Sequence, residues 1–73
     1  MNSIYSPEYR RMIKRLESTR LDRRMRQVDV AESLGRHQSY VSKIENCERR
    51  LDIAELKEFL SIYGISSDVI FED

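Results

Sequence analysis

The sequence predicts a compact all-α domain of five short helices. Apolar residues recur at helical spacing through most of the chain, and no segment alternates apolar and polar side chains as a half-buried strand does. The chain has two glycines, Gly35 and Gly64, and one proline, Pro7, so its helices should be joined by short turns. Its 73 residues suffice for one domain, and we expect residues 1–73 to form it.

The first predicted helix begins at Pro7 and ends around residues 22 to 24. Ser6 is a good N-cap, Pro7 suits the first helical position, and Glu8 complements the positive end of the helix dipole. The apolar side chains that recur along one face of this helix are Tyr9, Met12, Ile13 and Leu16.

Two shorter helices are predicted over residues 27–34 and 38–45. Gly35 ends the first of them, as a glycine commonly does just beyond a helix C-terminus. The side chains that should face the core are Val30, Ala31, Leu34, Val41 and Ile44. Taken by themselves, these segments could simply be two packing helices.

The fourth predicted helix has the clearest boundaries. Asp52 and Glu55 form a D-x-x-E start that is close to a capping box, and Gly64 ends the helix. Its apolar stripe consists of Ile53, Leu56, Phe59, Leu60 and Tyr63. A last short turn through residue 71, capped by a serine at position 66 or 67, completes the five helices.

The composition argues against several classes of protein. With 40% hydrophobic and 36% charged residues, the chain should be soluble and folded. No apolar run approaches the roughly 18 to 20 residues of a membrane span, and the N-terminus lacks the apolar stretch of a secretory signal, so we expect cytoplasmic residence. One cysteine and one distant histidine do not make a metal site. No nucleophile lies in an activating motif, and we expect no enzyme, no cofactor and no small-molecule ligand.

The net charge of zero conceals a segregation of charge along the chain. Residues 1–50 contain 12 Lys or Arg and 7 Asp or Glu, a net charge of +5, whereas residues 51–73 contain one Lys and 6 acids, a net charge of −5. Recognition depends on the local field, so a neutral total does not exclude a polyanionic partner. A chance asymmetry in a short chain is the alternative.

The second and third predicted helices have the pattern of a helix-turn-helix. In this motif the first helix crosses the DNA backbone and the second enters the major groove, where base edges offer distinguishable donors and acceptors. The motif needs a small residue at the turn and hydrogen-bonding side chains on the second helix. Gly35 provides the turn, and the hydrogen-bonding side chains are Gln38, Ser39 and Lys43. The pattern therefore predicts a DNA-binding motif over about residues 27–46.

The stretch QVDVAESLGRHQSYVSKIENCERRLDIAEL resembles the Cro/repressor-type (XRE-type) helix-turn-helix transcriptional regulators. The matching landmarks are Gln27, Ala31, Leu34, Gly35, Gln38, Ser39, Val41, Ser42, Ile44, Glu45, Asn46, Leu51 and Leu56. The resemblance covers roughly residues 9 to 71. It implies a lambda-repressor-like fold and double-stranded DNA as the partner.

The resemblance also implies roles for individual side chains. Gln38, Ser39 and Lys43 should contact bases, with adenine as the preferred partner of Gln38 and guanine available to Lys43. Gln27, at the start of the first helix of the motif, should bind a phosphate and brace Gln38. The implied internal salt bridge joins Arg20 and Glu45. A solvated helix face is the alternative for the polar side chains.

Three positions depart from the pattern of these regulators. Arg26 stands where a hydroxyl usually caps a helix, so either the preceding helix runs on or Arg26 binds phosphate. His37 also replaces a usual hydroxyl cap. Cys47 occupies a site where glycine is common, and a left-handed backbone there costs a non-glycine residue on the order of 1 kcal/mol. The phosphate contacts that we expect are those of Arg26, Gln27, His37, Tyr40, Asn46, Arg49 and Arg50.

We expect a homodimer that binds a pseudo-palindromic operator and acts as a repressor, because the related regulators read two-fold sites. Half-sites should lie one helical turn, roughly 34 Å, apart. An apolar patch for the second subunit is expected at Ile62, Ile65, Val69 and Phe71. Scattered surface apolar residues are the alternative. An antitoxin or another protein-interaction module could use the same fold, as could a structural or enzyme-accessory subunit.

Overall fold

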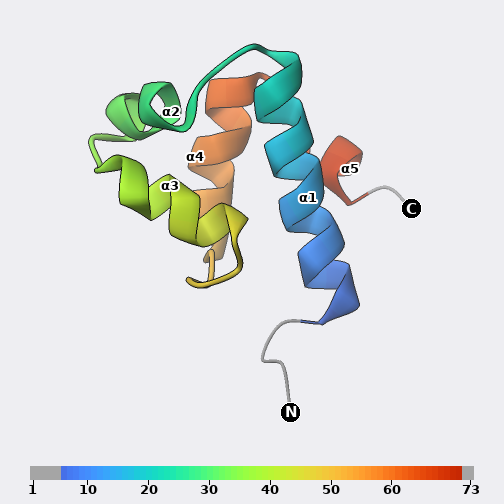
Figure 1. Ribbon diagram of the computed structural model, residues 1–73. Helices are drawn as coiled ribbons and strands as arrows, with labels where there is room; N and C mark the ends of the chain where they lie inside the picture. Colours follow the sequence, from blue (N-terminus) through green and yellow to red (C-terminus); the bar gives the residue numbers. More distant parts are fainter. Residues whose placement is uncertain (1–5, 72–73) are drawn as a thin grey trace.

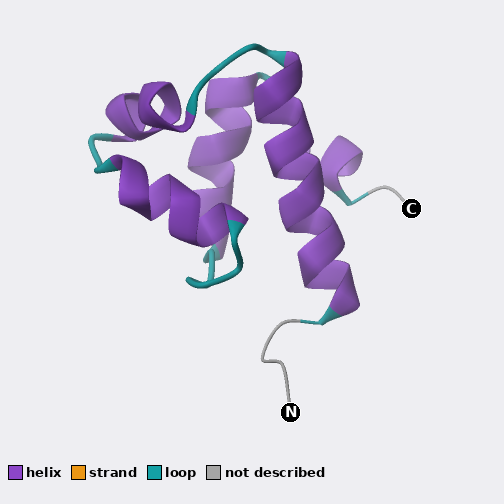
Figure 2. Ribbon diagram, viewed as in Figure 1, coloured by secondary structure: helices purple, strands orange, loops and turns teal. Residues whose placement is uncertain are grey.

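The computed structural model describes residues 6–71, which form five α-helices (Figure 1). They are α1 (Pro7–Asp22), α2 (Gln27–Leu34), α3 (Gln38–Glu45), α4 (Ile53–Tyr63) and α5 (Ser67–Ile70). Loops alone join these helices, and residues 6–71 contain no strand (Figure 2). The predicted all-α class is confirmed. None of the helices in this part of the chain has the length and apolar character that crossing a membrane requires.

The helix boundaries follow from local capping chemistry. The Ser6 hydroxyl accepts a hydrogen bond from the Tyr9 backbone N–H at 3.1 Å, immediately before Pro7 starts α1. At α4 the Asp52 carboxylate accepts from the Glu55 N–H at 2.8 Å, and the Glu55 carboxylate accepts from the Asp52 N–H at 3.0 Å. This reciprocal capping box satisfies two N–H groups that a helix start otherwise leaves without partners.

The core lies where α1, α2, α3 and α4 converge. In Figure 1 the long helix α1 stands between α5 on one side and the other three helices on the other. The largest fully buried side chains are Phe59, Ile13, Leu16, Ile44, Ile70, Val30 and Val41. Every one of the five helices except α5 contributes more than a single buried side chain, so each is fixed mainly by burial of its apolar face.

The short helix α5 is fixed to α1 by side chains rather than by its own length. Ile70 is buried in the core, and the Arg15 guanidinium donates to the Ile70 carbonyl at 3.1 Å. Arg23, the C-cap of α1, donates to the carbonyl of Tyr63, the last residue of α4. A four-residue helix is not stable alone, so these contacts hold the C-terminal segment in place.

The predicted apolar stripe of α4 was wrong at one position. Ile53, the first residue of α4, is 69% exposed, although Glu55 and Leu56 later in the same turn are buried. The apolar side chain buried beside this end of the helix is Leu51, in the preceding loop. The loop backbone is held by the Tyr9 hydroxyl, which accepts from the Leu51 N–H at 3.0 Å.

Candidate nucleic-acid interface

Helices α2 and α3 form a helix-turn-helix with a sharp, glycine-dependent turn. Gly35 adopts a left-handed conformation with φ of 69°, and the Arg36 N–H donates back to the Ala31 carbonyl at 2.9 Å. A left-handed backbone favours glycine because other residues pay a steric penalty there. Val30 and Val41 are completely buried where the two helices pack together. The turn and this packing set the angle at which α3 leaves α2.

One face of α3 is buried and the opposite face carries hydrogen-bonding side chains. The buried side chains are those of Tyr40, Val41 and Ile44. Gln38, Ser39 and Lys43 are exposed. Ser39 and Lys43 are one helical turn apart, so they share a face, and Gln38 is the first residue of the helix. This is the arrangement that direct reading of base edges requires of a recognition helix.

The implied Arg20–Glu45 salt bridge is present and buried. The Arg20 Nε lies 2.7 Å from Glu45 Oε2, and the two side chains are only 8% and 3% exposed. A second nitrogen of the same guanidinium donates to Glu45 Oε1 at 3.0 Å, and a third donates to the Met25 carbonyl at 2.9 Å. The hydrogen bond with Glu45 raises the pKa of Arg20 although burial opposes this. The pair ties the C-terminal end of α3 to α1.

A chain of side-chain hydrogen bonds extends from this salt bridge to the exposed face. Gln27 Nε2 donates to Glu45 Oε1 at 2.9 Å, and Gln38 Nε2 donates to Gln27 Oε1 at 2.9 Å. The brace between Gln27 and Gln38 that the resemblance implied is therefore present in the structure. It restricts Gln38 before any DNA is bound, which lowers the entropy lost on binding.

Tyr40, for which a phosphate contact was expected, lies on the buried side of α3. Tyr40 is only 8% exposed and its ring stacks against Phe59 with 6.3 Å between the ring centroids. Within residues 6–71 its buried hydroxyl has no hydrogen-bond partner. Burial, and secondarily the nearby carboxylate of Glu55, raise the pKa of Tyr40 to about 12. The residue lies on the core side of α3 because the helix turns its apolar stripe, Val41 and Ile44, in that direction.

Tyr40 instead supports two arginines. The guanidinium carbon of Arg36 lies 4.4 Å from the centroid of the Tyr40 ring, and that of Arg49 lies 4.8 Å from it. Cation–π contacts of this kind favour defined positions for both charges. Arg49 also forms an ion pair with Glu55 at 3.1 Å, which lowers the pKa of Glu55 to about 2. Arg36 was not among the residues expected at DNA from the sequence, although its place directly after the turn glycine was a usable signal.

Comparison with known proteins identifies this arrangement. The family model described as a helix-turn-helix domain matches residues 14–70. An XRE-family like protein from Pseudomonas syringae pv. tomato str. DC3000 has 36% identity and a TM-score of 0.81, covering 86% of this chain and 77% of that chain. A tyrosine-to-alanine mutant of the restriction-modification controller protein C.Esp1396I has 27% identity and a TM-score of 0.81, covering 92% and 87%. A search of curated proteins found no match.

The chain belongs to the XRE family of helix-turn-helix transcriptional regulators. Its DNA-binding motif is therefore the α2–α3 unit. At the start of α2 this XRE-family chain has Arg26, whose side chain provides no cap, because a guanidinium has only donors. Arg26 pairs instead with Asp29, nitrogen to oxygen at 2.9 Å, and the Asp29 carboxylate accepts from the Arg26 backbone N–H at 2.8 Å. Helix α1 ends at Asp22, so it does not run on into α2.

The remaining residues expected at phosphates surround α3. His37 occupies the N-cap of α3 without capping it, and Gln27 lies at the start of α2. Asn46 follows α3 as its C-cap and its side-chain amide lies 3.5 Å from the Ser42 hydroxyl. Arg50 is exposed, with its guanidinium carbon 5.8 Å from the Tyr9 ring centroid. His37, Asn46 and Arg50 are all exposed.

Cys47 has the left-handed backbone that its position predicts. Its φ is 59°, and the following Glu48 N–H donates to the Lys43 carbonyl at 2.8 Å. The half-buried Cys47 side chain packs against the core, which offsets part of the conformational cost. Arg24, after α1, has a similar φ of 58° that the sequence did not indicate. Among the described residues, no group of three or more His, Cys, Asp or Glu could hold a metal ion.

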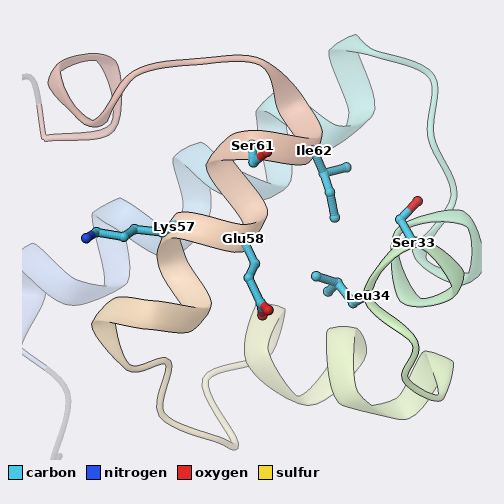
Figure 3. Close-up of a pocket in the computed structure, with 6 residues that line it drawn as sticks. All are labelled: Ser33, Leu34, Lys57, Glu58, Ser61 and Ile62. Carbon is cyan, nitrogen blue, oxygen red and sulfur yellow. The ribbon is translucent and has the colours of Figure 1, made fainter.

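The four apolar residues expected at a subunit interface differ in exposure. Val69 and Phe71 are 48% and 58% exposed. Ile62 and Ile65 are half-buried and pack against the core. Ile62 and Leu34 approach one another in a surface groove of about 390 Å³ between α2 and α4 (Figure 3). The groove also includes Ser33, Lys57, Glu58 and Ser61.

Proposed function

We propose that this regulator represses transcription by binding a pseudo-palindromic operator as a homodimer, with α3 of each copy in a major groove. The observation that carries the proposal is the two-sided character of α3. Its apolar side chains are buried, while Gln38, Ser39 and Lys43 are exposed and have the chemistry of base-reading groups. A helix fixed on one face and polar on the other is suited to insertion into a groove.

The bases expected at the reading face follow from hydrogen-bonding capacity. The Gln38 amide has a donor and an acceptor, which suits adenine N7 and N6. The Lys43 ammonium is a donor only, which suits guanine O6 and N7. The Ser39 hydroxyl can both donate and accept, so it adds affinity with less discrimination. Such contacts specify sequence, whereas contacts with phosphates position the protein without reading bases.

A rim of cationic and polar side chains around α3 supports phosphate binding. Arg36 and Arg49 are held on the Tyr40 ring, and Arg50 follows in the next loop. The phosphate contacts that we propose are those of Arg26, Gln27, Arg36, His37, Asn46, Arg49 and Arg50. Each cation that neutralises a phosphate should steepen the dependence of affinity on salt by roughly 0.9 in log–log slope.

Dimerisation is proposed through the exposed apolar surface at the C-terminal end. Val69 and Phe71 offer the most area to bury, with Ile62 and Ile65 contributing their remaining exposed surface. The segment after residue 50 has a net charge of −5, so its place at a subunit interface keeps it away from phosphates. Two copies would then read half-sites roughly 34 Å apart.

Control of restriction-modification genes is a narrower second candidate. The likeness to a restriction-modification controller protein, at 27% identity over 92% of this chain, favours it. A selected operator that occurs upstream of a restriction or methylation gene in the source genome would support this role. An operator found only at unrelated genes would argue against it.

The central test is selection of bound sequences from a random duplex pool at several salt concentrations. We expect a two-fold symmetric consensus, and Lys43→Ala should weaken binding to it by about tenfold. The matched control is Lys57→Ala, which removes the same charge from an exposed position on α4. A steep salt dependence with no enriched sequence would refute the proposal of a specific operator.

Dimerisation needs a separate measurement, sedimentation of the free protein and of its complex with DNA. Phe71→Asp should convert the dimer to a monomer while the fold survives, because Phe71 is 58% exposed. Ile53→Asp is the matched control, since Ile53 is 69% exposed at the start of another helix. Sedimentation that shows a monomer both free and on DNA would contradict the proposed dimer.

A further inference from the structure

The hydrogen bonds that connect Arg20, Glu45, Gln27 and Gln38 have a fixed direction. Glu45 forms the buried ion pair with Arg20, so its carboxylate is ionised and can only accept hydrogen bonds. Gln27 must therefore turn its Nε2 towards Glu45, as it does at 2.9 Å. The opposite orientation would place two acceptor oxygens against one another.

The orientation of Gln27 determines that of Gln38. With Nε2 of Gln27 turned to Glu45, Oε1 is the Gln27 atom that lies towards Gln38, and an oxygen requires a donor. Gln38 accordingly directs its Nε2 to that oxygen at 2.9 Å. The carboxylate thus sets the orientation of two successive amides, and the second of them is on the exposed face of α3.

The direction of these bonds decides which groups Gln38 offers to DNA. One N–H of Gln38 is used by Gln27, so one N–H and the carbonyl oxygen are left for a base. A donor beside an acceptor complements adenine, whose major-groove edge has the N7 acceptor and the N6 donor. The reversed amide would offer two N–H groups and complement guanine, whose edge has two acceptors, N7 and O6.

We propose that Glu45 is a specificity-determining residue, a buried positioning group that makes Gln38 select adenine over guanine without touching DNA. This inference rests on the proposed contact between Gln38 and a base. It assigns Glu45 a role beyond joining α3 to α1, since a purely structural salt bridge would affect stability and leave base preference unchanged. The discriminating readout is therefore the preference at one base pair, not the affinity.

The first test changes Gln27 and leaves the Arg20–Glu45 pair intact. Binding of each variant is compared on two duplexes that differ only by adenine or guanine at the base pair whose preference Gln38→Ala abolishes. Gln27→Met removes the amide, and the adenine-to-guanine preference should fall about tenfold. Gln27→Lys places a donor beside Gln38 and should move the preference towards guanine. Loss of the Gln27 phosphate contact affects both duplexes equally and cancels in the ratio.

The second test removes the carboxylate itself. Arg20→Met combined with Glu45→Leu replaces the buried ion pair by apolar side chains, a change that folded domains tolerate. We expect about the same tenfold loss of preference as with Gln27→Met. Ile70→Val is the control for reduced stability, because it trims the core away from these hydrogen bonds and should leave the preference unchanged. Thermal unfolding establishes that each variant is folded in the binding assay.

The outcomes separate this inference from the proposed function. If the wild-type protein enriches no sequence, the proposed operator binding fails. If Gln38→Ala abolishes a preference for a base other than adenine, the inference fails while the operator remains. The inference also fails if the adenine preference survives in Gln27→Met and Gln27→Lys. A preference lost in the Gln27 variants and retained in a folded Arg20→Met/Glu45→Leu protein would assign the role to Gln27 alone and overturn that of Glu45.

Discussion

Removing Arg20 should destabilise this domain far more than removing the whole Arg20–Glu45 pair. In Arg20→Met the Glu45 carboxylate, whose side chain is 3% exposed, loses two charged hydrogen bonds of 2.7 and 3.0 Å. Among the described residues, the hydrogen-bond partner left to it is the Gln27 amide at 2.9 Å. A buried charge with so little compensation is the main source of the effect.

The magnitude can be set against the stability of the whole domain. Breaking a buried ion pair by removing one partner costs about 3 to 5 kcal/mol. A domain of 73 residues has a free energy of unfolding of about 4 to 11 kcal/mol. Because 1 kcal/mol shifts the midpoint of a domain this size by about 4 to 8 °C, Arg20→Met should lower Tm by at least about 12 °C. In Arg20→Met/Glu45→Leu no buried charge is left without a partner. The free energy of unfolding should fall by only about 1 to 2 kcal/mol, because the Met25 carbonyl and the Gln27 amide each lose a hydrogen bond.

The assay is thermal and urea unfolding followed by circular dichroism at 222 nm for the wild type, the two single variants and the double variant. The expected result is a double variant that is more stable than either single variant. A double variant whose loss equals the sum of the two single losses would refute the reasoning, because independent contributions mean that no stranded charge is involved.

The other predictions concern the turn at Gly35, the Glu55 carboxylate, the Tyr40 hydroxyl and the Arg36 guanidinium. Gly35→Ala should lower the free energy of unfolding, measured in urea, by about 1 to 2 kcal/mol, because φ at this position is 69°. An added Cβ would meet nothing within 4 Å, so the penalty is purely conformational, and an unchanged stability would contradict it. The depressed pKa of Glu55 means that its stabilising contribution is complete above about pH 4.5 and lost as pH falls towards about 2, so the acid decrease in Tm should be smaller in Glu55→Gln than in the wild type. Tyr40→Phe should leave DNA affinity within about twofold, since the hydroxyl is buried; a larger loss would restore the phosphate contact. Arg36→Ala should lower the log–log salt slope by roughly 0.9 with no change in consensus, and an unchanged slope would remove Arg36 from the phosphate set.

Much of the fold was predictable because its signals are local. The Ser6 cap, the Asp52–Glu55 capping box and the glycines at the ends of α2 and α4 act within a few residues of sequence, and each fixed a helix boundary as predicted. The apolar spacing along α1 likewise predicted its buried face. The burial expected for Ile53 was wrong, because hydrophobic spacing gives the face of a helix but not which residue of that face first reaches the core.

The candidate nucleic-acid interface was likewise predictable only where its signals are local. The sequence by itself placed Gln38, Ser39 and Lys43 on the exposed side of α3, because helical periodicity alone separates them from Val41 and Ile44. Only the tertiary structure decided the rest. The Tyr40 ring contacts the guanidinium groups of Arg36 and Arg49. These contacts depend on how the turn before α3 and the loop after it pack against the helix. The direction of the bonds from Glu45 through Gln27 to Gln38 required three helices in contact, and no spacing along a chain can determine it.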